Sequence, residues 1–99
     1  MNRYYRRTEV IELLSLEEEF LDRLLRETSI CEEIGGAFSA DDVERIRIAH
    51  HLEKDLGVNR PGIEVALRLR EKMLAERREL LSVIEALRRR LMREVEKER

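Results

Sequence analysis

The chain has few of the residues that break helices or cross-link chains. Its 99 residues include one proline, four glycines, one cysteine and no tryptophan. The single cysteine, Cys31, excludes an internal disulfide, and no apolar run approaches the roughly 20 residues that a membrane-spanning helix needs. Aromatic residues make up only 4% of the chain, whereas charged residues make up 42%. Because the apolar residues recur at regular positions, this composition favours a helical, soluble protein over a disordered one, and we expect it in the cytoplasm.

Acidic and basic residues are unevenly distributed along the chain. Residues 1–56 carry 14 acids and 8 bases, a net charge of −6, whereas residues 57–99 carry 8 acids and 12 bases, a net charge of +4. The imbalance is greatest in residues 8–42, where 11 acids accompany only two bases, Arg23 and Arg26. A surface of this charge repels phosphate and attracts basic partners.

The C-terminal part has the sequence of one long helix. No glycine or proline follows Gly62, and the good helix formers Leu, Arg, Glu and Ala dominate from Pro61 onward, which predicts a helix of roughly 38 residues. Apolar residues in its first half form a broad stripe that we expect to pack on the preceding domain. They are Ile63, Ala66, Leu67, Leu69, Met73 and Leu74.

The second half of this helix has a narrow apolar stripe at spacings of four, three, four and four. We call it the seam, and it consists of Leu80, Ile84, Leu87, Leu91 and Val95. A narrow stripe is buried by a second helix, so the seam predicts a homodimer formed through a coiled coil. The alternative is a frayed, solvated helix, because most of the last dozen residues are charged.

Residues 1–56 are predicted to form one small domain, and residues 57–99 a part devoted to packing and oligomerisation. Five short elements are expected in the first part: a strand (2–7), a helix (9–14), a second helix (16–27), a hairpin around two glycines (28–38) and a third helix (40–55). Ser15 and Ser39 each begin a capping-box pattern, which predicts that they cap the second and third helices. Gly57 is expected to end the third helix.

This order of elements resembles the MerR-like winged-helix superfamily, which implies a mainly α fold. The expected architecture is a helix-turn-helix, a minimal β-hairpin wing and a long C-terminal helix. The resemblance is carried by residues 38–43 (FSADDV) and 56–67 (LGVNRPGIEVAL). The second string is similar to the "GVN…GI" turn of the heat-shock repressor branch and to the "PGI.VAL.L" string of the CbpM-type chaperone modulator family.

The resemblance to chaperone modulators implies a protein that binds the J domain of a DnaJ-type, CbpA-like co-chaperone and inhibits its action on Hsp70. J domains present a basic helix, so charge and resemblance favour the same partner-binding residues, at the starts of the second and third helices. They are Glu17, Glu18, Glu19, Asp22, Asp41, Asp42, Glu44 and Arg45.

Two other classes of function remain open: a MerR-like DNA-binding transcriptional regulator and a structural dimerisation module. A DNA-reading helix-turn-helix presents Arg, Lys, Asn or Gln at the start of its second helix. Here that turn is Glu17-Glu18-Glu19. Nucleic acid is therefore not the expected partner.

The sequence contains no pattern typical of an enzyme. His50 and His51 are adjacent, so on a helix their side chains diverge by about 100° and cannot hold one metal ion together. Cys-x-x-Cys pairs, phosphate-binding loops and nucleophile elbows are all missing from the sequence. We therefore expect no catalytic residue, metal site or cofactor, and a function in binding.

Overall fold

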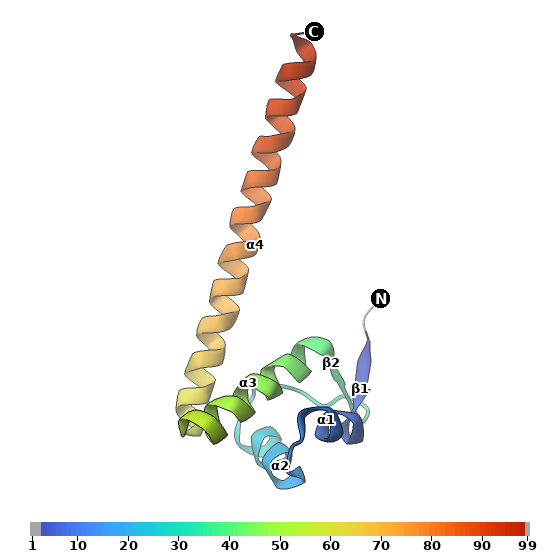
Figure 1. The fold of residues 1–99 in the computed structure, drawn as a ribbon, viewed down its shortest axis with the longest axis vertical. Coiled ribbons are helices and arrows are strands. Elements are labelled where there is room, and N and C mark those ends of the chain that lie inside the picture. The colour runs from blue at the N-terminus through green and yellow to red at the C-terminus, as the bar shows by residue number, and fades with distance from the viewer. Residues whose placement is uncertain (1–2, 99) are drawn as a thin grey trace. The chain divides into compact units, whose positions relative to one another are not determined.

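Six elements make up the fold in the computed structural model, which describes residues 3–98 (Figure 1). In chain order they are β1 (Tyr4–Arg6), α1 (Arg7–Leu14), α2 (Glu18–Glu27), β2 (Ala37–Ser39), α3 (Ala40–Leu56) and α4 (Arg60–Lys97). Internal contacts divide the chain into a compact unit that ends at Leu67 and a second unit that begins at Arg68. The predicted mainly α class with one long C-terminal helix is confirmed. The predicted boundary between residues 56 and 57 stays a prediction.

The two strands flank the helix-turn-helix in the sequence: β1 precedes α1, and β2 follows α2. β1 pairs antiparallel with β2, so that Tyr4 faces Ser39, Tyr5 faces Phe38 and Arg6 faces Ala37. The predicted wing is a two-residue turn, Gly35-Gly36, closed by a single bridge between Ile34 and Ala37. Both glycines have positive φ, 60° and 76°, which side chains disfavour. The main partner of β2 is therefore the N-terminal strand rather than the residues that precede the turn.

One apolar core holds the first unit together. Its buried residues come from α1, α2, β2, α3 and the start of α4, together with the turn residue Leu16: Val10, Leu16, Phe20, Leu21, Leu24, Phe38, Val43, Ile46, Ala49, Ile63 and Leu67. Phe20, Leu21 and Leu24 form the buried face of α2. No polar or charged residue among residues 3–98 is buried in this core, so the unit depends on the burial of apolar surface.

Two of the three predicted helix-end signals, Ser39 and Gly57, are confirmed. Ser39 caps α3, because its hydroxyl accepts a hydrogen bond from the Asp42 amide at 3.1 Å, and Gly57 ends that helix in the left-handed conformation at φ 65°. Asn59 accepts a hydrogen bond from the Gly62 amide at 2.9 Å and caps α4. The prediction for Ser15 was wrong: it ends α1 at φ 52° and does not cap α2.

Candidate functional site

Three of the predicted partner-binding residues lie together where α2 begins. Glu17 is the N-cap residue of α2, and Glu18 and Glu19 form its first turn. All three are exposed, and their carboxylates have no ion pair or hydrogen bond within the part of the chain that the structure describes. We call them the α2 acids. Carboxylates near a helix N-terminus are stabilised by the helix dipole, so this turn holds an uncompensated negative charge without loss of helix stability.

The fourth acid of this helix, Asp22, is held by a cation. Its carboxylate is paired with the guanidinium of Arg7 at the start of α1, and the same guanidinium pairs with Glu33 at 3.0 Å. Arg7 thereby ties α1, α2 and the loop before β2 together. Asp22 is less available to a partner than the α2 acids. Sequence reasoning missed Arg7, because its partners lie 15 and 26 residues further along the chain.

The predicted residues of α3 are largely neutralised within the helix. Asp42 accepts a hydrogen bond from Arg45 at 2.9 Å, and Glu44 pairs with Arg47, whose Nε lies 3.1 Å from the nearer carboxylate oxygen. Only Asp41 of this group is exposed and lacks such a pair among residues 3–98. The strongest unbalanced negative charge of the first unit is therefore at the start of α2.

Two other titratable side chains, Cys31 and His50, pack within the first unit. Burial, followed by the nearby Asp42 carboxylate, raises the pKa of the Cys31 thiol to about 12, so the thiol stays protonated and unreactive near neutral pH. The rings of His50 and Phe20 pack edge to face, with their centroids 5.0 Å apart. Within residues 3–98, no three side chains of the kinds that bind metals gather at one point.

The seam of α4 is an apolar stripe exposed to solvent along the second unit. Its five side chains are between 49 and 62% exposed. Leu69 and Met73 are also more than half exposed, and their predicted packing on the first domain stays a prediction. They precede Leu80 at spacings of four and seven, so they continue the seam toward the N-terminus of α4. Ile63 and Leu67 lie on the other, buried stripe.

None of the helices within residues 3–98 combines the length and the apolar character needed to cross a bilayer.

Comparison with known proteins identifies the family of this chain. Residues 5–94 match the family described as MerR HTH family regulatory protein. The match runs from β1 through most of α4. No curated protein and no solved structure matches the chain. The family consists of regulatory proteins rather than enzymes. Because the match covers most of its length, the chain belongs to the MerR HTH family of regulatory proteins.

Proposed function

We propose that this MerR-family protein is a chaperone modulator of the CbpM type. It binds the J domain of a DnaJ-type, CbpA-like co-chaperone through its first unit and blocks the use of that co-chaperone by Hsp70. The proposal keeps the cytoplasmic location expected from the sequence. The modulator acts by occlusion, because a J domain whose basic helix is covered cannot present that helix to Hsp70.

One observation carries this proposal: the turn that would read DNA in a helix-turn-helix bears three carboxylates and no cation. The α2 acids are exposed and unpaired among residues 3–98. Complementary charge speeds the encounter of two proteins and orients them, so this turn fits a basic helix. The string 56–67, which resembles the chaperone modulators, also supports the proposal. It runs from the last residue of α3 through the turn into the start of α4, away from the α2 acids in the sequence.

The proposed assembly is a homodimer formed through the seam. Seven apolar side chains, the five of the seam with Leu69 and Met73, lie on one stripe of α4 and are all about half exposed or more. Burying such side chains contributes about 1.5 to 3 kcal/mol each when burial is complete. A second copy of the same helix offers a matching stripe, which is the usual solution for a symmetric assembly.

Reversing the charge of the α2 acids should weaken binding to the J domain. In the variant Glu18→Lys with Glu19→Lys, two lysines replace two carboxylates and repel the basic groups of the J domain that the carboxylates would attract. We therefore expect the association rate to fall about tenfold or more at low salt. The difference should shrink at high salt, where ions screen exposed charges. Asp22 is left intact because its pair with Arg7 belongs to the fold. Surface plasmon resonance against the purified J domain, at two salt concentrations, measures the effect.

A matched control changes the net charge by the same amount elsewhere. Glu79 and Glu96 are exposed residues of α4 without ion pairs in residues 3–98, so Glu79→Lys with Glu96→Lys should bind the J domain like the wild type. Circular dichroism must first show equal helix content for both variants. Equal association rates for the α2 variant and the wild type at low salt would contradict the proposal.

The family match favours one alternative, a DNA-binding regulator. The α2 acids instead predict that the protein binds DNA weakly. Nonspecific DNA binders have dissociation constants of roughly 1 μM to 0.1 mM at physiological salt, and this affinity comes from cations that displace counterions. With three carboxylates in the recognition turn, binding to random duplex DNA should be weaker than that range. Fluorescence anisotropy with a labelled duplex tests it. A tight, salt-sensitive complex would favour the DNA-binding regulator over the chaperone modulator.

A further inference from the structure

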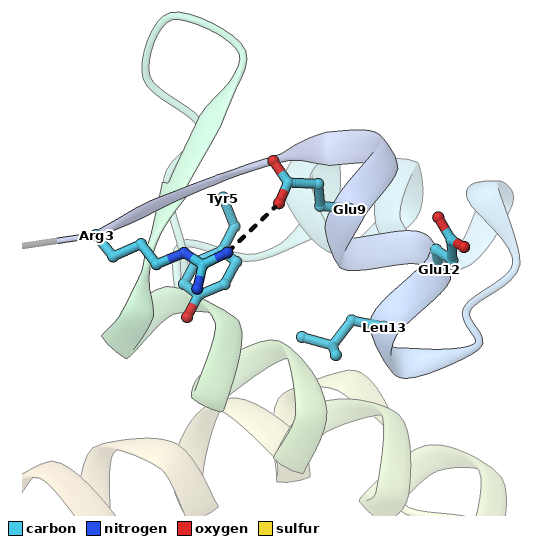
Figure 2. Close-up of a pocket in the computed structure, with 5 residues that line it drawn as sticks. All are labelled: Arg3, Tyr5, Glu9, Glu12 and Leu13. Carbon is cyan, nitrogen blue, oxygen red and sulfur yellow. Dashed lines mark ion pairs between the residues drawn. The ribbon is translucent and has the colours of Figure 1, made fainter.

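A groove lies between β1 and α1. Its volume is about 460 Å³, and it is lined by Arg3, Tyr5, Glu9, Glu12 and Leu13 (Figure 2). A volume of this size is within the range of sites that hold a small ligand or a few side chains of a partner. None of the residues that line it was among the predicted partner-binding residues.

The groove contains an apolar side chain that the fold does not cover. Leu13 is 63% exposed, although Val10, three residues earlier on α1, is fully buried. The half-buried ring of Tyr5 supplies a second partly apolar wall. An apolar side chain from a partner would therefore gain contacts here that water cannot provide.

The groove already accommodates a guanidinium group. The Arg3 guanidinium carbon lies 4.7 Å from the centroid of the Tyr5 ring, and the same group is 4.0 Å from the Glu9 carboxylate. Figure 2 shows Arg3 lying across Tyr5 with this ion pair. An aromatic face combined with a carboxylate is a favourable environment for a cation.

A second carboxylate in the groove has no cation beside it. Glu12 follows Glu9 by three residues, a spacing that places both on one side of α1. Its side chain is exposed and has no ion pair or hydrogen bond in the described part of the chain. Arg3 balances only one of the two acids, so the groove keeps a net charge of −1 next to an exposed leucine.

We propose that this groove binds a helical segment of a partner that carries an arginine or lysine one turn away from an apolar side chain. The apolar side chain contacts Leu13 and Tyr5, and the cation pairs with Glu12, while Arg3 remains on Glu9. This inference rests on the proposed function in one respect, because it assigns the segment to the basic helix of the J domain. It adds a specific apolar contact to a surface that charge alone would leave nonselective.

Two peptides test the groove without the J domain. Both are alanine-based helices of about 16 residues with one leucine, and one carries arginine four residues after the leucine while the other carries glutamate there. In a titration of the ¹⁵N-labelled full chain, the arginine peptide should shift the amides of Tyr5, Glu12 and Leu13, and the glutamate peptide should not. The variants Glu12→Gln and Leu13→Ser should each weaken the arginine peptide at least about fivefold. Three results would overturn the proposal that the groove binds such a segment: equal shifts with both peptides, shifts confined to other residues, or unchanged affinity in both variants.

The same variants separate this inference from the proposed function. If the J domain binds the wild type and loses affinity with Glu12→Gln and Leu13→Ser, at unchanged Tm, the groove is part of its binding surface. If the J domain binds these variants as tightly as the wild type, the groove is overturned as its site and the proposed function stands. If the J domain does not bind the wild type at all, both the proposed function and the assignment of the segment to the J domain are overturned.

Discussion

Replacing Phe38 by alanine should destabilise the first unit by about 3 to 5 kcal/mol, the range for truncating a buried phenylalanine. Phe38 is the largest fully buried side chain of the fold, and it lies on β2 opposite Tyr5. A small domain has only about 5 to 15 kcal/mol of stability. Each kcal/mol corresponds to about 4 to 8 °C in Tm for a domain of this size, so we expect Tm to fall by at least about 12 °C. Thermal unfolding followed by circular dichroism measures it.

An exposed neighbour provides the control for Phe38. Ile34 forms the bridge that closes the glycine turn, but its side chain is exposed, so Ile34→Ala should change stability by no more than about 0.5 kcal/mol. Both variants are compared with the wild type at one protein concentration, because the proposed association through α4 would make Tm depend on concentration. A loss below about 1 kcal/mol for Phe38→Ala would mean that the core is not organised around this residue.

Local signals predicted most of the fold. α4 was predicted from the absence of glycine and proline, and its observed length of 38 residues matches. Ser39 and Gly57 were correctly assigned as the two ends of α3, because each acts on backbone groups a few residues away. Ser15 was assigned wrongly, because the Ser-x-x-Glu pattern is also compatible with a serine that ends the preceding helix.

The candidate site was predictable in its charge but not in its partners. The α2 acids are exposed because α2 buries its apolar face in the core, which leaves the opposite face in water. The pairing of Asp22 with Arg7 depends on a contact between distant parts of the chain, which no local pattern encodes. The groove beside Leu13 was missed because it forms only when β1 lies next to α1. The seam remains a prediction, since its proposed partner is a second chain.

Placing a carboxylate in the centre of the seam should separate the proposed dimer. In Leu87→Asp, each chain brings a charge next to Ile84 and Leu91, and no cation of the seam is available to pair with it. Desolvating such a group costs several kcal/mol. At 1.4 kcal/mol per factor of ten, a cost of about 3 kcal/mol weakens the dimer about a hundredfold. Sedimentation velocity over a range of micromolar concentrations should show a dimer for the wild type and a monomer for the variant.

The control for the seam is the same kind of substitution on another face of α4. Met92 is about half exposed and directly follows Leu91, so its side chain points about 100° away around the helix. Met92→Asp introduces the same charge at a similar cost in helix propensity, and it should leave the dimer largely intact. If both variants dissociate alike, the loss comes from charge or helix fraying and not from the seam. A wild type that sediments as a monomer at these concentrations would rule out the homodimer itself.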